Sequence, residues 1–190
     1  MKIGIDISQL AYQKTGVATY LQNLVENLIL QDSGNDYVLF YASLRRPLPD
    51  GKLWKTTNGM TRVTVDQFPT KVKSVVVTQL PFPPTLLDLL WNKLHIIPIE
   101  WLIGPIDIFI SSDWTQPPSK AKKITIIYDM IVYKYPKETA EKIVRVQKKR
   151  LKWVKKEVDK ILCISNATKK DAMEILKLPE NRLEVIYPGI

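Results

Sequence analysis

Apolar and polar positions alternate along this chain between the spacing of strands and the spacing of helices. Isoleucines occupy every second position of Lys2–Ser8, which is the pattern of a half-buried strand. Apolar side chains then recur every three or four residues from Val17 to Leu28, which predicts an amphipathic helix. Turn-forming residues follow, and Tyr37–Ala42 is a continuous apolar run of the kind found in buried strands. The first 42 residues therefore predict a strand, a helix and a second strand.

The same two spacings continue to the end of the chain. Further strands are expected at Arg62–Phe68, Ile106–Ser111, Lys123–Asp129, Ile161–Ile164 and Leu183–Tyr187, and further helices at Thr85–His95, Lys137–Asp159 and Asn166–Leu178. The segment from Pro69 to Pro84 is interrupted by prolines and is expected to be a connection. Strands that alternate with helices in this way form parallel sheets with right-handed crossovers. The pattern predicts an α/β fold: a doubly wound, mostly parallel Rossmann-like sheet with helices on both faces.

Length and composition favour one ordinary folded domain. The chain has 190 residues, of which 45% are hydrophobic and 25% charged, a balance typical of globular proteins. No apolar stretch reaches the ~20 residues that a membrane-spanning helix needs, and the amino terminus lacks the features of a signal peptide. We expect a cytoplasmic protein, with peripheral contact at the inner face of the membrane as an open alternative.

The sequence has one cysteine, Cys163, and one histidine, His95, in distant segments. A zinc site or a histidine-dependent nucleophile is therefore not expected, and we predict no metal and no cofactor. Cys163 lies in an apolar run and is interpreted as a small buried side chain. His95 lies near the end of an apolar helix and is interpreted as a packing or interface residue.

The net charge of +9 favours acidic partners, and much of the positive charge falls in the segment Lys142–Lys160. This segment predicts either a solvated outer helix or a face for an anionic surface. Trp91 and Trp101, the latter with Leu102 and Ile103 beside it, could pack on the sheet, which is the default interpretation, or reach a bilayer interface. Both interpretations remain open at this point, and nucleic acid is not expected as a partner.

Candidate chemistry is sought at the carboxyl ends of the strands, where open α/β sheets bind ligands. Gly16 and Val17 begin a helix after the first strand, where free N–H groups favour a phosphate, although Gly16 could also be a plain turn. The polar loop Ser111–Pro118 could line a cleft or turn the chain. Tyr128–Asp129 ends a strand, and its carboxylate could bind a sugar hydroxyl or hold a loop. Ser165 is interpreted first as the N-cap of the following helix.

Four segments in this order carry a resemblance to a known family. MKIGIDISQL with KTGVATYLQNLVENL, IIYDMIVYKYP, DKILCISNATKKDAMEIL and LEVIYPGI resemble successive motifs of glycosyltransferase family 4. The resemblance covers nearly the whole chain and implies one half of a GT-B fold, in which two Rossmann-like domains face each other across a cleft. It implies that residues 1–190 form the N-terminal, acceptor-side domain and that the C-terminal, donor-binding domain is absent from this chain.

The resemblance also implies a function. Members of this family transfer a sugar from a nucleotide-sugar donor, with retention of configuration, to a glycan, a lipid-linked acceptor or a small glycoside. Gly16 and Val17 would lie beside the donor diphosphate, Ser165 at the cleft floor, and Tyr128 and Asp129 near the transferred sugar. Tyr128 stands where the family usually has His. Most donor contacts belong to the absent domain, so we expect this chain to be inactive alone.

An alternative interpretation from a different class remains open. The chain could be a non-catalytic α/β binding or regulatory domain, in which the basic helix binds an anionic partner.

Overall fold

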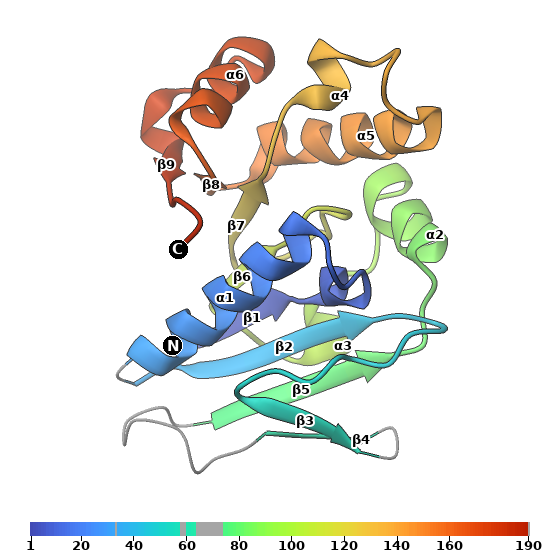
Figure 1. Ribbon diagram of the computed structural model, residues 1–190, viewed down its shortest axis with the longest axis vertical. Coiled ribbons are helices and arrows are strands. Elements are labelled where there is room, and N and C mark those ends of the chain that lie inside the picture. The colour runs from blue at the N-terminus through green and yellow to red at the C-terminus, as the bar shows by residue number, and fades with distance from the viewer. Residues whose placement is uncertain (33, 58–59, 64–73, 190) are drawn as a thin grey trace.

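The main structure is a seven-stranded parallel sheet in the order β5-β2-β1-β6-β7-β8-β9 (Figure 1). The computed structural model describes residues 1–32, 34–57, 60–63 and 74–189. The strands are β1 (Lys2–Asp6), β2 (Asp36–Ala42), β5 (Ser74–Leu80), β6 (Ile108–Ser111), β7 (Lys122–Ile127), β8 (Lys160–Cys163) and β9 (Leu183–Val185). Each pair of neighbours in this sheet is parallel. The predicted doubly wound, Rossmann-like α/β fold is confirmed.

Helices fill the connections between the strands. They are η1 (Ser8–Ala11), α1 (Gly16–Gln31), α2 (Pro84–Leu87), η3 (Asp88–Lys93), α3 (Glu100–Ile103), α4 (Ile131–Lys134), α5 (Glu141–Glu157), α6 (Asn166–Leu176) and η4 (Glu180–Arg182). The strand order reverses between β1 and β6, because successive strands are added on one side of β1 and then on the other. This reversal is the switch point at which such sheets form a ligand crevice.

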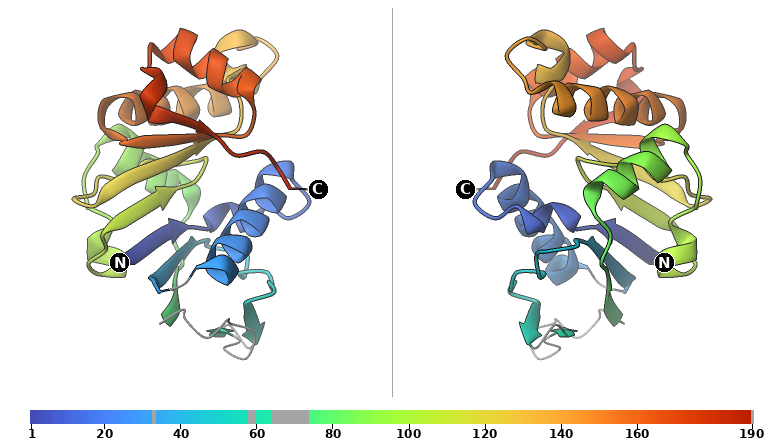
Figure 2. Two further views of the ribbon diagram at one scale, coloured as in Figure 1. Left: turned by 90° about the vertical axis from the view of Figure 1, so that its left-hand side faces the viewer. Right: turned by 90° about the vertical axis from the view of Figure 1, so that its right-hand side faces the viewer.

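The two faces of the sheet carry different helices. α1 packs on one face, where its Leu21 and Val25 share a core with Ile5 and Leu39. The opposite face is covered by α2 and η3 over Phe40, and by α5 and α6 over β7 and β8. Figure 2 shows α1 and α2 on opposite sides of the strands. Adjacent residues of a strand thus enter different cores, as the alternation of side chains requires.

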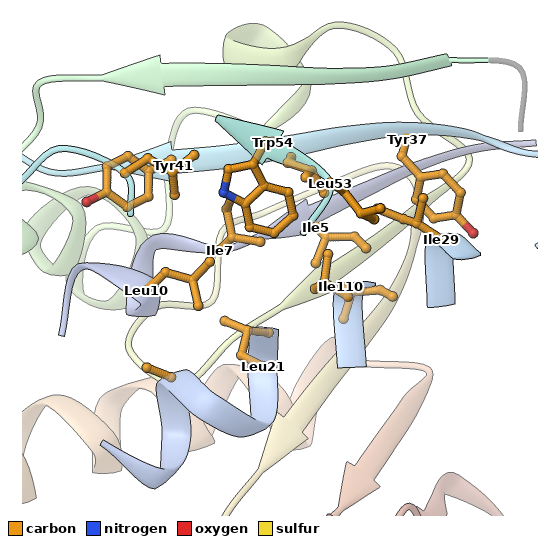
Figure 3. Packing of buried hydrophobic residues seen from close by; sticks show 14 of the residues in the cluster. Ile5, Ile7, Leu10, Leu21, Ile29, Tyr37, Tyr41, Leu53, Trp54 and Ile110 are labelled. Atoms are coloured by element: carbon orange, nitrogen blue, oxygen red, sulfur yellow. The ribbon is translucent and has the colours of Figure 1, made fainter. Parts of the chain in front are cut away.

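A separate hairpin extends the core beneath α1. Its strands β3 (Trp54–Thr57) and β4 (Met60–Val63) pair antiparallel. Trp54 is fully buried and lies close to Ile5 and Ile7 of β1 (Figure 3). Its indole nitrogen donates to the carbonyl of Pro49 at 2.9 Å, so the ring is buried with its polar atom satisfied.

The predicted third strand at Arg62–Phe68 can be compared with the structure only at Arg62 and Val63, where a strand is found, although not in the main sheet. Arg62 and Val63 belong to the antiparallel hairpin, and residues 64–68 lie outside the described residues. The strand beside β2 is β5, which falls inside the segment predicted to be a connection. Every residue of β5 keeps some exposure, because it is an edge strand, and the prolines on both sides of its apolar run favoured a connection over a strand.

The predicted helix from Lys137 to Asp159 is shorter than expected. α5 begins at Glu141, and the Thr139 hydroxyl instead donates to the carbonyl of Tyr135 at 3.1 Å. A short helix, α4, precedes this turn. The other predicted helices and strands differ from the observed ones only near their ends. Among the described residues, no helix has the length and apolar content needed to cross a membrane.

Candidate functional site

Two cavities lie along the carboxyl edge of the sheet. The larger, of about 320 Å³, lies between the loops after β1, β2 and β6 and the start of α2. The smaller, of about 150 Å³, lies between the start of α1, the end of β7 and α5. Both adjoin the switch point between β1 and β6 and its neighbour β7, where crevice ligands bind in this class of fold.

The smaller cavity brings together three of the residues that sequence reasoning selected. Val17, Tyr128 and Asp129 all line it, although Val17 and Tyr128 are 111 positions apart. Gly16 directly precedes Val17 as the first residue of α1. The Thr15 hydroxyl accepts a hydrogen bond from the Ala18 amide at 3.2 Å and caps the helix. A Cβ added to Gly16 would meet nothing within 4 Å, so the backbone at this point is open.

Tyr128 is buried, with its ring edge against the ring of Tyr20 at a centroid distance of 5.5 Å. Its hydroxyl has no hydrogen-bond partner among the described residues. Burial raises the pKa of this hydroxyl well above its ordinary value, and the charge of Asp113 raises it further. The Ser112 side chain interacts with this hydroxyl and opposes the rise, so Tyr128 is a neutral hydroxyl with hydrogen-bonding capacity to spare.

Asp129 and Ser165 have structural partners. Asp129 is exposed, and its Oδ1 accepts from the Ile131 amide at 3.0 Å at the start of α4. The Ser165 hydroxyl accepts from the Thr168 amide at 3.1 Å and caps α6, as the first interpretation predicted. Ser165 does not line either cavity described above. It is linked to the site through Thr168, whose hydroxyl donates to the carbonyl of Tyr128 at 3.1 Å.

Arg150 of α5 is a site residue that sequence reasoning missed. Arg150 belongs to no motif, because it lies on the apolar stripe of its helix, among the residues predicted to face the sheet. It is 1% exposed. One guanidinium nitrogen donates to the Ser112 carbonyl at 2.6 Å, the Thr125 hydroxyl at 2.7 Å and the Ile126 carbonyl at 2.8 Å. A cation in an apolar stripe is the signal that could have identified it, because a charge is buried only with partners.

Two carboxylates accompany this buried cation. Asp113, in the polar loop after β6, lies 3.8 Å from an Arg150 nitrogen. Asp6, at the end of β1, is 3% exposed and accepts from the Ser8 amide at 2.9 Å. Burial raises the pKa of both carboxyl groups, and the charge of Arg150 opposes the rise. Asp6 and Arg150, which are buried, and the half-buried Asp113 form a group of charges at the switch point, which we call the charge cluster. Such clusters are common at functional sites, although structural networks produce them too.

The larger cavity also lies outside the predicted site. Asp6 and Ser8 line it from β1, and Tyr12, Arg45 and Arg46 from the following loops. The Arg46 guanidinium donates to the Ala11 carbonyl at 2.8 Å and lies 5.0 Å from the centre of the Tyr12 ring. Both loops follow sheet strands but are far apart in the sequence, so only the fold brings them together.

No group of three or more potential metal ligands occurs within the described residues. Within the charge cluster, Arg150 lies 3.8 Å from the Asp113 carboxylate, and its charge opposes the rise in the pKa of Asp6.

The comparison with protein families gives the class of the chain. A family model described as Glycosyltransferase Family 4 matches residues 14–190. The chain belongs to glycosyltransferase family 4. The resemblance seen in the four sequence motifs is thereby confirmed.

Among solved structures, the chain is similar to the crystal structure of Anabaena Alr3699/HepE in complex with UDP, with a TM-score of 0.44 and 12% sequence identity. The match covers 100% of this family 4 chain and 44% of that chain. The present chain thus spans less than half the length of that protein. The search of curated proteins found no match.

Proposed function

We propose that this family 4 chain is the acceptor-side part of a retaining glycosyltransferase that uses a nucleotide-sugar donor. The acceptor would be a glycan, a lipid-linked molecule or a small glycoside. Family membership over residues 14–190 supports the class of reaction. The observation that supports this site is the cavity at the carboxyl edge where Val17, Tyr128 and Asp129 meet.

The donor diphosphate would lie at the start of α1. The first amides of a helix have no partners within the helix, and the helix dipole favours negative charge there. Gly16 leaves the backbone open to close approach because it has no side chain. Most other donor contacts would come from the second domain of the GT-B fold.

The transferred sugar would lie near Tyr128 and Asp129. A neutral phenol can donate to a sugar hydroxyl or accept from one, and the Tyr128 hydroxyl has no partner among the described residues. The second Asp129 oxygen can accept a further hydrogen bond while Oδ1 holds the Ile131 amide. Ser165 would support this floor indirectly, through the Thr168 bond to the Tyr128 carbonyl.

We assign the acceptor to the larger cavity. It combines aromatic side chains, Tyr12 and Trp114, with the polar groups of Asp6, Gln9 and Arg45. Cavities with a few polar groups on an otherwise apolar wall are typical small-molecule sites. The charge cluster lies between the two cavities, because Asp6 lines one while Asp113 and Arg150 line the other.

Because half of the cleft would be contributed by another domain, we predict that residues 1–190 do not transfer sugar alone. The direct test compares sugar transfer by this chain with transfer by the two-domain protein, without added metal. Transfer by the 190-residue chain at the rate of the two-domain protein would refute the proposal that the site is shared.

Replacing Tyr128 by Phe tests the proposed sugar contact. We expect turnover of the two-domain protein to fall by up to about tenfold, the effect of one lost neutral hydrogen bond. Stability should be unchanged or slightly higher, because the buried hydroxyl that is removed has no partner among the described residues. The measurements are kcat/KM and urea unfolding, with Tyr135→Phe at an exposed position as the control. Unchanged kcat/KM in Tyr128→Phe would contradict the assignment.

A further inference from the structure

Four large apolar side chains are exposed within a short stretch on the face opposite α1. They are Leu89, Leu94, Ile96 and Trp101, with exposed fractions of 40%, 50%, 47% and 78%. We call them the apolar edge. Large apolar side chains that are exposed together in one region of a soluble domain mark an interaction surface. Trp101 is the strongest sign of such a surface, because its indole ring is exposed while the nearby Ile103 is buried in the core.

The backbone at the apolar edge is strained. His95 and Ile97 have φ values of 54° and 63°, in the left-handed region that β-branched residues such as isoleucine rarely adopt. Ile96 lies between them and is turned toward solvent. Such strain persists only where the surroundings enforce it, and it is concentrated at functional positions.

Three hydrogen bonds hold this strained turn in place. The Ile96 amide donates to the Leu90 carbonyl at 2.9 Å, and the Trp91 indole nitrogen donates to the Ile97 carbonyl at 3.0 Å. The His95 Nδ1 lies 2.9 Å from the Trp91 carbonyl. Trp91 is itself buried, so the turn is anchored to the core. The exposure of Leu94 and Ile96 is therefore built into the fold.

Lysines of α5 lie beside the strained turn. The Trp153 indole nitrogen donates to the Asn92 carbonyl at 2.9 Å, and the His95 ring stacks on Trp153 with centroids 3.5 Å apart. Lys156 covers the same indole at 4.9 Å from the ring centre. Lys152, one turn earlier on α5, and Lys93, next to Asn92, are exposed. We call Lys93, Lys152 and Lys156 the lysine row.

The neighbouring acidic groups are occupied by internal bonds. Glu157 lies 3.0 Å from the Lys123 ammonium and 3.1 Å from the His95 ring. Glu100 accepts from the Ser119 hydroxyl and from the amides of Lys120 and Ala121. Among the described residues, no carboxylate pairs with the lysine row, which therefore faces solvent and makes this surface positive.

We propose that the apolar edge and the lysine row together dock this chain on an anionic lipid surface. Aliphatic and indole side chains enter the interface of a bilayer, while lysines bind its anionic headgroups, and the two contributions combine. Nucleic acid fits less well, because aliphatic side chains do not stack on bases and the Trp153 ring is already covered by His95 and Lys156.

The position of this surface is compatible with catalysis. α3 leads into the amino end of β6, and Lys123 lies at the amino end of β7. Both cavities of the candidate site lie at the carboxyl edge. Figure 2 shows α2, α3 and α5 on the side away from α1. A membrane bound here would leave the start of α1 uncovered.

The test is co-sedimentation of the protein with vesicles of phosphatidylcholine alone or mixed with phosphatidylglycerol. We expect binding to the mixed vesicles that weakens with salt. Lys152→Gln with Lys156→Gln should weaken it about 25-fold, since each lysine near an anionic surface contributes about fivefold. Ile96→Ser with Trp101→Ser should abolish the part of the binding that persists at high salt.

Two control variants remove the same kinds of side chain, apolar and lysine, at other places on the surface. Val76→Ser removes a half-exposed apolar side chain from β5, and Lys142→Gln with Lys170→Gln removes two exposed lysines. Both controls should bind vesicles nearly as well as the parent protein, and circular dichroism should be unchanged in every variant.

Three outcomes would overturn the proposal. The first is no binding to mixed vesicles. The second is binding that the control lysines reduce as much as the lysine row does, which would mean attraction by net charge alone. The third is a dimer, or tighter binding to a single-stranded oligonucleotide, that Ile96→Ser with Trp101→Ser disrupts while vesicle binding is unchanged.

Discussion

Arg150 joins three parts of the candidate site through one guanidinium group. It bonds the loop after β6 at Ser112, the strand β7 at Thr125 and Ile126, and its own helix at Gln147. Burial lowers the pKa of this guanidinium, and the charge of Asp113 opposes the change. A buried charge with this many partners fixes the relative positions of the elements that it joins.

Replacing Arg150 by Met should lower the free energy of unfolding by roughly 3–5 kcal/mol, the usual effect of breaking a buried ion pair. The loss arises because two carbonyls and a hydroxyl keep their burial but lose their donor, while Asp113 loses its ion pair. Urea unfolding measures it. Arg145→Met, at an exposed position of the same helix, should change stability by less than about 0.5 kcal/mol. Equal losses in the two variants would show that Arg150 contributes only its aliphatic contacts.

Asp6 makes the stability depend on pH. Burial raises its folded pKa above the ordinary value of 3.8. The folded chain therefore holds the proton more tightly than the unfolded chain, and stability falls as the pH rises from 3.8 through the folded pKa. Asp6→Asn removes this ionisation, so its stability relative to the parent should increase as the pH rises above 3.8 and should level off above the folded pKa.

The measurement is urea unfolding of both proteins at several pH values. Glu138→Gln, which removes an exposed carboxylate, should give a difference from the parent that is nearly constant with pH. An advantage of Asp6→Asn that grows toward acid pH would mean that the carboxylate is stabilised by Arg150 more than it is penalised by burial.

At the scale of elements, the start of α1 combines two properties. Thr15 caps the helix with its hydroxyl, and Gly16 leaves open space where a side chain would project. Capping fixes the direction of the first amides, while the missing side chain leaves them accessible. The same helix also carries Tyr20, which packs on Tyr128. The helix thus connects the proposed diphosphate site to the proposed sugar site.

Replacing Gly16 by Val should reduce turnover without reducing the stability of the fold. The free energy of unfolding should change by less than about 0.5 kcal/mol, because valine is no worse than glycine in a helix and its Cβ meets nothing within 4 Å. Turnover of the two-domain protein should fall at least tenfold if a diphosphate approaches this backbone. Gly34→Val, at another open position far from the site in the fold, should leave both quantities unchanged. Normal turnover in Gly16→Val would make Gly16 an ordinary turn residue.

At the scale of the whole molecule, the sheet buries residues from both ends of the chain in shared cores. Leu162 and Ile164, near the end of the chain, pack against the core formed by α1 and the first strands. The Tyr20 hydroxyl donates to the carbonyl of Ile186 at 3.0 Å, which ties the last described residues to α1. These contacts predict that the domain unfolds as one cooperative unit.

The reactivity of the Cys163 thiol can be used to measure this unfolding. It is fully buried in β8, and burial raises the pKa of its thiol to about 11. A thiol reagent at about pH 8 should therefore react at least a hundredfold more slowly with the folded chain than with the chain in urea. Rates in increasing urea should follow the global unfolding curve. An added exposed thiol, Lys170→Cys, should react at once. Rapid labelling of the parent in buffer would show that β8 opens independently of the rest of the domain.

The sequence by itself determined the fold class, most of the elements and the family. Isoleucines at alternate positions, buried apolar strands and amphipathic helices each carry a local signal, because burial on one or two faces dictates the periodicity of a segment. Ser165 as a cap and Cys163 as a buried thiol could be recognised for the same reason. The four motifs could be recognised because they retain short, ordered residue patterns.

Only the tertiary structure decided which distant residues meet. It placed Val17 beside Tyr128, made β5 the edge strand, and joined Asp6 and Asp113 to Arg150. Sequence periodicity reports the burial of a residue but not the identity of its neighbours, which depends on the order of strands in the sheet. The charge cluster therefore became visible only when the carboxyl ends of β1, β6 and β7 were placed side by side.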